Sequence, residues 1–306
     1  MAGGRLGVDL AGLKFANPTV LASGVLGYSS ESFESVVAGG AGGIVTKSIG
    51  LEARVGYANP TVFQARCGLV NAMGLPNPGV EGFVAEVRRA KSVLRVPLIV
   101  SVYGYSAEEY ASVAEKVVGA GADGVELNVS CPHVRATGSE ISQSPKLVAV
   151  VVGAVKGRVD KPVFVKLSPN VTDVVAIAEA SVKAGANGLT VMNTLRAMAI
   201  DVETGRPVLG NVRGGLSGAA VKPVALRCVY DIFECVKAPI FGCGGVTDWR
   251  DAVEFLLAGA SAVQIGTAVA LAGCGVFGEV CRGVDAYLLK KGFGSVEEIV
   301  GYSHKC

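Results

Sequence analysis

A cysteine with the position of a catalytic group follows one of the apolar runs. Cys131 stands in Asn128-Val129-Ser130-Cys131-Pro132, directly after Gly124-Val125-Glu126-Leu127. The proline favours extended backbone at Cys131, and a loop position just beyond a strand suits a reactive thiol better than a packed one. The alternative is that Cys131, like most free cysteines, is a small buried hydrophobe. Position alone leaves both interpretations open.

Two lysines stand at the ends of apolar segments, where a buried ammonium group would need a partner. Lys47 follows Ile44-Val45-Thr46, and Lys166 follows Val163-Phe164-Val165. Because burying an unpaired ammonium is costly, we expect an anionic ligand beside each lysine, with an internal carboxylate as the alternative.

Three asparagines, Asn71, Asn128 and Asn193, fall at the ends of apolar runs or in the segments that follow them. Each side-chain amide offers a donor and an acceptor, so together they suit a small ring with amide edges. The two histidines are His133 and His304, and the chain has no Ser-His-Asp arrangement or acidic cluster with metal-ligand spacing. Cys131 is therefore the best candidate for a proton acceptor.

Glycines gather at two later strand ends, in Gly242-Cys243-Gly244-Gly245 and Gly266-Thr267. Glycine lets backbone N–H groups approach a phosphate closely. The phosphate site of a TIM barrel is built from the loops after strands seven and eight and a short helix N-terminus. The two motifs together indicate a phosphorylated ligand or cofactor.

A recurring sequence motif indicates the helices and strands that must position these residues. Gly-Ala followed by an apolar run occurs at Gly40, Gly121, Gly185 and Gly259, although Gly40-Ala41 is followed by two further glycines. Each copy follows a helical pattern, which predicts a helix end followed by a buried parallel strand. Apolar runs beginning with a proline alternate with these copies, at 18–23, 97–103, 162–167 and 239–243.

Counting both sets gives eight strands, so we predict a single TIM barrel over residues 1–306, with a doubly wound sheet as the alternative. Residues 107–118, 172–184 and 248–257 are predicted helices, the last capped by Thr247. A short hairpin turning at Ala11-Gly12 is expected before the barrel. Insertions are expected after strand two, at 49–80, and after strand six, at 195–217, with a hairpin about Thr204-Gly205.

Composition excludes several classes of function. Twenty-eight basic and 26 acidic residues, without a basic run, give no footprint for nucleic acid or an anionic membrane. The start lacks the apolar core of a signal peptide, which predicts a cytoplasmic protein. The apolar segment 255–277 is interrupted by glycines and is read as a buried strand with its neighbours. The eight cysteines include no Cys-x-x-Cys pair, so an iron-sulfur cluster in this chain is not expected, and their disulfide pairing stays open.

With these residues assembled, the chain resembles class 1 dihydroorotate dehydrogenases over nearly its whole length, and class 1B catalytic subunits most closely. The motifs that carry the resemblance are Asn128–Pro132, Asn71-Ala72-Met73-Gly74-Leu75-Pro76-Asn77, Thr46-Lys47-Ser48, Gly214-Gly215-Leu216-Ser217-Gly218, Gly244-Gly245 and Gly266-Thr267. The resemblance implies a TIM barrel that holds FMN and oxidises dihydroorotate to orotate in pyrimidine biosynthesis.

The same resemblance assigns roles to residues of this chain. Cys131 would be the base that removes the C5 proton while a hydride passes from C6 to flavin N5, under a lid formed by residues 132–145. The implied substrate residues are Lys47, Asn71, Met73, Gly74, Leu75, Asn128, Asn193 and Thr194. The implied FMN residues are Ser23, Lys47, Ser48, Asn128, Lys166, Val191, Gly218, Gly244, Gly245, Gly266 and Thr267.

The resemblance also implies partners. Class 1B enzymes pair this barrel with a separate subunit that holds FAD and a [2Fe–2S] cluster and passes electrons to NAD. A homodimer within a heterotetramer is therefore expected here. Class 1A enzymes instead act alone as homodimers with fumarate as acceptor, but Cys131-Pro132-His133-Val134-Arg135 is closer to the 1B form.

Three alternatives stay open. Many family members carry asparagine where this chain has His133, and Cys-Pro-His resembles the pyrimidine-reducing domain of dihydropyrimidine dehydrogenase. A flavin-free, phosphate-binding lyase or synthase could use Lys166 or Lys47 for a Schiff base. A catalytically silent barrel retained as a binding partner would use none of these groups.

Overall fold

Eight parallel strands close into a barrel in a computed structural model, which describes residues 4–129 and 141–305. Around the barrel they follow one another in chain order, as a TIM barrel requires and a doubly wound sheet does not. The barrel strands are β3 (Thr19–Leu21), β4 (Gly43–Val45), β9 (Leu98–Val102), β10 (Gly124–Asn128), β11 (Val163–Lys166), β12 (Gly188–Val191), β17 (Ile240–Cys243) and β18 (Ala262–Ile265). All eight predicted strands are confirmed.

The four prolines of the apolar runs stand one residue before their strands. Pro18, Pro97, Pro162 and Pro239 have no N–H to donate, but each carbonyl accepts a backbone N–H from the neighbouring strand at 2.8–3.0 Å. Each proline therefore extends the hydrogen-bonded ladder without leaving a donor unpaired.

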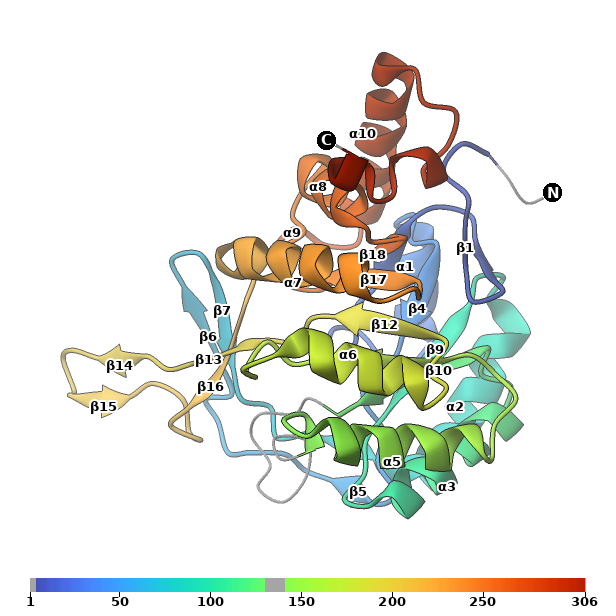
Figure 1. Ribbon diagram of the computed structural model, residues 1–306. Helices are drawn as coiled ribbons and strands as arrows, with labels where there is room; N and C mark the ends of the chain where they lie inside the picture. Colours follow the sequence, from blue (N-terminus) through green and yellow to red (C-terminus); the bar gives the residue numbers. More distant parts are fainter. Residues whose placement is uncertain (1–3, 130–140, 306) are drawn as a thin grey trace.

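Helices surround the barrel, and the predicted helix ends are confirmed (Figure 1). Gly40, Gly121, Gly185 and Gly259 have φ between +104° and +117°, a conformation that glycine adopts without steric cost. This requirement explains why the phrase recurs. The helices described are α1 (Ser30–Ala38), α2 (Gly79–Val93), α3 (Ala107–Gly119), α5 (Pro145–Lys156), α6 (Val174–Lys183), α7 (Lys222–Cys235), α8 (Trp249–Ala258), α9 (Thr267–Ala272) and α10 (Val276–Lys291), with short 3₁₀ turns η1 (Ala219–Val221), η2 (Glu297–Ile299) and η3 (Tyr302–Lys305).

One predicted helix cap is wrong. Asp248, not Thr247, caps α8, because its side chain accepts the backbone N–H groups of Arg250 and Asp251. Thr247 instead donates its N–H and hydroxyl to Asp251. Aspartate reaches the free N–H groups of the first turn as well as threonine does, and it was the residue directly before the helix.

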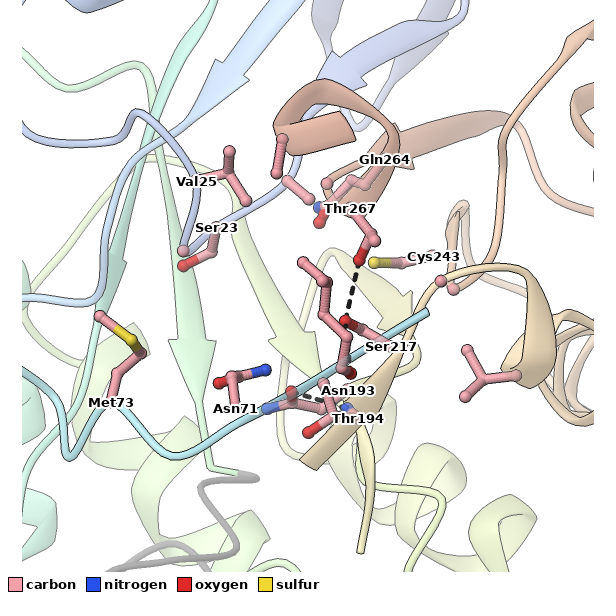
Figure 2. A pocket seen from close by; sticks show the side chains of 18 of the residues that line it. Ser23, Val25, Asn71, Met73, Asn193, Thr194, Ser217, Cys243, Gln264 and Thr267 are labelled. Atoms are coloured by element: carbon pink, nitrogen blue, oxygen red, sulfur yellow. Dashed lines mark hydrogen bonds between the residues drawn. The ribbon is translucent and has the colours of Figure 1, made fainter. Parts of the chain in front are cut away.

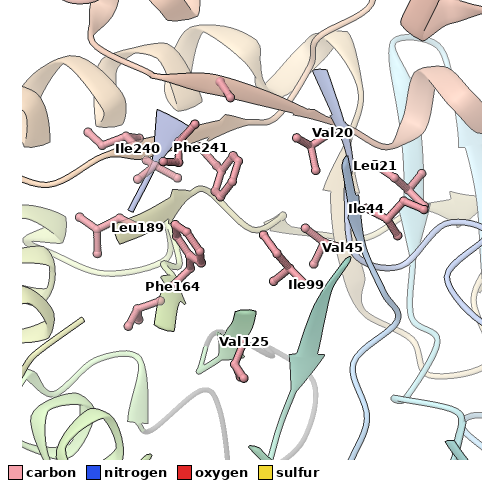
Figure 3. Close-up of a cluster of buried hydrophobic side chains, with 14 of the residues drawn as sticks. Val20, Leu21, Ile44, Val45, Ile99, Val125, Phe164, Leu189, Ile240 and Phe241 are labelled. Carbon is pink, nitrogen blue, oxygen red and sulfur yellow. The ribbon is translucent and has the colours of Figure 1, made fainter. Parts of the chain in front are cut away.

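The barrel core is apolar at the end where the chain enters it. Hairpin β1 (Val8–Leu10) and β2 (Leu13–Phe15) turns at Ala11-Gly12, both with positive φ, as predicted. Phe15 is buried and meets Phe241 edge-on, with ring centroids 5.8 Å apart. Phe164 lies 5.0 Å from the same ring. Figure 3 shows Phe164 and Phe241 with the valines and isoleucines of the surrounding strands.

The two predicted insertions join in one antiparallel sheet, in the order β13–β16–β7–β6. Figure 1 shows this sheet and the β14–β15 arm at the end of the barrel away from hairpin β1–β2. The arm turns at Thr204-Gly205, as predicted. The strands are β5 (Ala53–Arg54), β6 (Val62–Ala65), β7 (Gly68–Asn71) and β8 (Asn77–Pro78) in the first insertion, and β13 (Leu195–Ala197), β14 (Ile200–Asp201), β15 (Arg206–Pro207) and β16 (Gly214–Ser217) in the second.

The apolar segment 255–277 contains the end of α8, strand β18 and helix α9. Strand β18 is buried throughout, as predicted, whereas residues 270–273 are exposed. Across residues 4–129 and 141–305, no helix has the length and apolarity needed to cross a membrane.

Candidate active site

A cavity of about 470 Å³ lies at the carboxyl ends of the barrel strands, beside the sheet of the two insertions. Its volume is in the range of small-ligand sites. It brings together nearly all predicted site residues: Ser23, Lys47, Ser48, Asn71, Met73, Gly74, Leu75, Asn128, Lys166, Asn193, Thr194, Gly218, Gly244, Gly245, Gly266 and Thr267. Val191 does not line the cavity and is fully buried at the end of β12. Cys131, His133 and most of the predicted lid lie outside the described residues.

Amide and hydroxyl groups gather on one side of the cavity. Figure 2 shows Asn71, Asn193 and Thr194 close together, with Met73 at the edge. Asn71 comes from β7, yet its Nδ2 donates to the carbonyl of Gly215 on β16 at 3.3 Å. The position of this amide therefore depends on both insertions.

A chain of polar contacts fixes Asn128 at the end of β10. Its Nδ2 donates to Ser48 Oγ at 2.9 Å, and Ser48 Oγ lies 2.9 Å from Ser101 Oγ. Tyr110 Oη donates to the Asn128 carbonyl at 2.9 Å. Because this residue is held through both its side chain and its backbone, its amide is preorganised for a ligand.

The opposite side of the cavity is formed by the predicted phosphate-site residues Gly244, Gly245, Gly266 and Thr267, here called the cradle. Gly244 and Gly245 have φ of +127° and +87°, and a Cβ on Gly245 would lie 2.7 Å from Lys222 Cβ. Thr267, the first residue of α9, donates from Oγ1 to Ser217 Oγ at 2.8 Å (Figure 2). These positions need glycine, so backbone N–H groups can face a phosphate closely.

Lys222, Asp251 and Glu254 form an ion-pair cluster next to the cradle. Asp251 on α8 accepts the Thr247 N–H at 2.8 Å, the Thr247 hydroxyl at 2.6 Å and Lys222 Nζ at 2.7 Å. Burial raises the pKa of Asp251, but hydrogen bonds from Lys222 and Thr247 outweigh this and leave it below the usual value. Asp251 thus ties the loop after β17 to α7 and α8.

The two lysines meet different surroundings. Lys166 has an internal carboxylate: its Nζ lies 3.6 Å from Glu126 Oε1, which confirms for this lysine the alternative that the sequence left open. Burial lowers the pKa of Lys166, but the Glu126 charge more than compensates and the pKa lies above its usual value. Nζ of Lys47 lies 5.8 Å from the centroid of the Tyr28 ring.

Several lining residues were missed by the sequence reasoning, among them Gln264, Cys243, Met192 and Ser217. Gln264 could have been recognised from the sequence, because it is a polar residue within an apolar strand that is followed by Gly266-Thr267. Glu126 could have been recognised in the same way, because it is a charged residue within the apolar run Gly124–Leu127. Burial raises the pKa of Cys243, which keeps this thiol protonated at neutral pH.

The described part of the chain contains six of the eight cysteines, whose disulfide pairing the sequence leaves open. Cys67, Cys228, Cys235, Cys243, Cys274 and Cys281 are free thiols. Within the same residues, no group of three or more His, Cys, Asp or Glu side chains has the geometry of a metal site.

Comparison with known proteins agrees with this geometry. The family model for dihydroorotate dehydrogenase matches residues 5–288. Relatives named dihydroorotate dehydrogenase B (NAD(+)), catalytic subunit, include those of Pyrococcus abyssi (52% identical, covering 98% of this chain and 99% of the relative), Thermococcus kodakarensis (52%, 97% and 97%) and Methanothermobacter thermautotrophicus (50%, 98% and 98%). A cavity with an amide-rich side and a glycine cradle, in a barrel matched along almost its whole length, shows that this chain belongs to the flavin-dependent dihydroorotate dehydrogenase family.

Proposed function

We propose that this chain is an FMN-dependent catalytic subunit of the class 1B type, which oxidises dihydroorotate to orotate in pyrimidine biosynthesis. The observation that carries the proposal is the arrangement of one cavity. Asn71, Asn128, Asn193 and Lys47 line it together with the glycines at 244 and 245. A ring with amide edges and a carboxylate suits the first group, and a cofactor phosphate suits the second.

The residues present fit FMN in three respects. The cradle admits close backbone approach to a phosphate, the cavity has the volume of a small-ligand site, and Gln264 Oε1 is a buried acceptor without a hydrogen-bond partner in the described structure. Gly244, Gly245, Gly266 and Thr267 would hold the phosphate, with Ser23, Ser48, Lys166 and Gly218 along the rest of the cofactor. Bound flavin supplies a two-electron acceptor for the hydride that leaves C6 of dihydroorotate.

The chain itself supplies positioning and proton transfer. Asn71, Asn193 and Thr194 would hold the pyrimidine ring, together with the backbone of Met73, Gly74 and Leu75. Lys47 would attract the substrate carboxylate, since a charged donor binds an anion more strongly than a neutral one. Cys131 would take the C5 proton, for which its thiolate form is required and a nearby cation is favourable.

The first test is an anaerobic visible spectrum of the purified protein before and after dihydroorotate is added. A flavin spectrum that bleaches supports the proposal. A flavin that responds to dihydrouracil alone would favour a dihydropyrimidine dehydrogenase activity, to which the His133 motif points. A colourless protein that FMN cannot reconstitute would refute the assignment of FMN.

The role of Cys131 needs its own variant. Cys131→Ser should retain FMN but reduce it much more slowly with dihydroorotate at neutral pH, because a serine hydroxyl is a far weaker acid than a thiol. Cys235→Ser is the matched control, since Cys235 is exposed on α7 and away from the cavity. Equal reduction rates in the two variants would remove Cys131 from the role of base.

The proposal extends to partners and location. The relatives' names contain "catalytic subunit" and "NAD(+)". We infer a separate subunit with FAD and a [2Fe–2S] cluster that passes electrons to NAD, a homodimer of this barrel within a heterotetramer, and a cytoplasmic location. Co-purification with such a subunit, followed by NAD reduction with dihydroorotate, tests the inference; activity with fumarate alone would favour class 1A.

A further inference from the structure

Beneath the cavity lies a buried polar network with a carboxylate, Glu126, that the proposed chemistry does not use. It joins Glu126 on β10, Lys166 on β11, Thr190 on β12 and Gln264 on β18. Glu126 and Gln264 are each 1% exposed, and Thr190 is fully buried. A charged carboxylate is rarely buried this deeply unless it is paired or has a function.

We propose that Glu126 is a positioning residue: it holds the Lys166 ammonium at the floor of the cavity, partly offsets its charge, and so sets how readily the bound cofactor accepts electrons. The inference rests on the proposed function, because it requires a redox cofactor in the cavity.

The strand register places the carboxylate below the ammonium. Asn128 pairs with Lys166 at the carboxyl ends of β10 and β11, and Glu126 lies two residues earlier on the same strand. Residues two apart face the same side of a strand. The Lys166 side chain therefore bridges from the cavity to the layer beneath it, where Nζ lies 3.6 Å from Glu126 Oε1.

Two donors fix the orientation of the carboxylate. Thr190 Oγ1 and Gln264 Nε2 each donate to Glu126 Oε2 at 2.8 Å. Oε1 has no hydrogen-bond partner in the described structure and is the oxygen that faces Lys166. The distance of 3.6 Å is longer than a hydrogen bond, so the ammonium keeps donors for a ligand above it.

Gln264 gives an independent indication that the network faces a ligand. A carboxylate only accepts, so the amide must turn Nε2 toward Glu126. This leaves Gln264 Oε1 buried, on a residue that lines the cavity and without a partner among the described residues. A buried acceptor of this kind is satisfied when a ligand donates an N–H or O–H to it.

Glu126 is also the natural counter-charge for this cavity. The described lining contains Lys47 and Lys166 and no aspartate or glutamate. Cys243 on β17 faces Lys166 too, but burial raises its pKa and keeps it neutral. Burial alone would lower the pKa of Lys166, and the Glu126 charge reverses this shift. Without Glu126, the lysine would be uncompensated and easier to deprotonate.

The consequence is a specific pH signature. A cofactor gains negative charge on reduction, and a nearby cation favours that state. With Glu126→Gln, a protonated Lys166 should raise the cofactor's midpoint potential. Between about pH 6 and pH 9 this increase should become smaller as pH rises, because the uncompensated lysine loses its proton more easily than in the wild type. We expect roughly a tenfold shift in the reduction equilibrium at the lower pH, which is about 30 mV for a two-electron couple.

The experiment measures the midpoint potential by dye equilibration across this pH range for wild type, Glu126→Gln and Glu126→Asp. Glu126→Asp keeps the charge and should retain the wild-type pH dependence. Parallel curves for Glu126→Gln and wild type would overturn the proposal. A wild-type protein without a flavin would refute the proposed function instead, so the two failures are distinguishable.

Glu126→Gln could fail to fold or to retain FMN, because it leaves a buried ammonium unpaired. The double variant Glu126→Gln/Lys166→Met removes both charges. If the pairing is the function of Glu126, the double variant should recover soluble protein with the far-ultraviolet circular dichroism of wild type. A double variant as defective as Glu126→Gln would overturn the proposal.

Discussion

Replacing Asp251 with asparagine tests whether the cluster behind the cradle stabilises both the barrel and its cofactor site. In Asp251→Asn, the amide oxygen can keep its contacts with Thr247, but the amide nitrogen must then face Lys222 Nζ. One charge-assisted hydrogen bond is lost and two donors are opposed. Such losses cost about 2–3 kcal/mol in buried sites.

The exposure of Lys222 reduces this estimate. Its side chain is 23% exposed and keeps Glu254 at 3.0 Å, so we expect a loss of about 2 kcal/mol in the free energy of unfolding. For a chain of 306 residues, with an unfolding entropy of about 2.1 cal/mol/K per residue, that corresponds to roughly 3 °C in apparent Tm. FMN should also bind more weakly, because Thr247 and Gly245 belong to one loop.

The assay is thermal unfolding at a fixed scan rate with and without FMN, together with the FMN dissociation constant. Asp231→Asn is the control, since Asp231 forms an exposed pair with Arg227 one helical turn away and should contribute less than about 1 kcal/mol. The pKa of Asp251 is lowered in the folded state. Its contribution is therefore present above the unfolded pKa and lost as pH falls through the folded pKa, so the difference between wild type and Asp251→Asn should shrink in acid. Identical Tm and FMN affinity in both variants at neutral pH would refute the reasoning.

Two further substitutions separate cofactor binding from barrel stability. Gly245→Ala places a Cβ 2.7 Å from Lys222 Cβ at a φ of +87°, so the protein should purify without FMN but with a barrel-like circular dichroism spectrum; retention of FMN at wild-type affinity would contradict the role of the cradle. Phe241→Ala empties the space between Phe15 and Phe164 and should cost about 3–5 kcal/mol, seen as a lower denaturation midpoint, whereas a change below about 1 kcal/mol would show that the apolar end of the barrel repacks.

The barrel was predictable because its signals are local. The positive φ at Gly40, Gly121, Gly185 and Gly259 requires glycine at each helix end, and a buried strand follows each one. The prolines before the other four strands mark their starts as clearly. These constraints act within a few residues, and they are therefore visible in the sequence without knowledge of the tertiary contacts.

The partners of buried polar groups were less predictable because they depend on strands far apart in the chain. Lys166 and Glu126 are 40 positions apart in sequence, and Gln264 reaches Glu126 across the barrel. The apolar residues before Lys166 show that this lysine needs a counter-charge but do not identify the partner.

The predicted cap of α8 was wrong for a different reason. Thr247 and Asp248 are both residues that cap helices well, and only the backbone conformation at Asp248 selects between them.

The sheet of the two insertions links parts of the candidate site that the barrel alone would leave independent. Asn71 belongs to the first insertion and Asn193 lies two residues before the second, while β7 pairs with β16 in register from Leu69 to Asn71. Because this pairing joins segments more than 140 residues apart, a change in either insertion moves the amide groups on the substrate side relative to the cradle. The cradle instead rests on α7 and α8 through Lys222 and Asp251. Strand β16 also reaches the cradle, because Ser217 accepts from Thr267, so β7 is the part of the sheet that separates the two sides. We therefore expect variants of β7 to weaken dihydroorotate binding more than FMN binding.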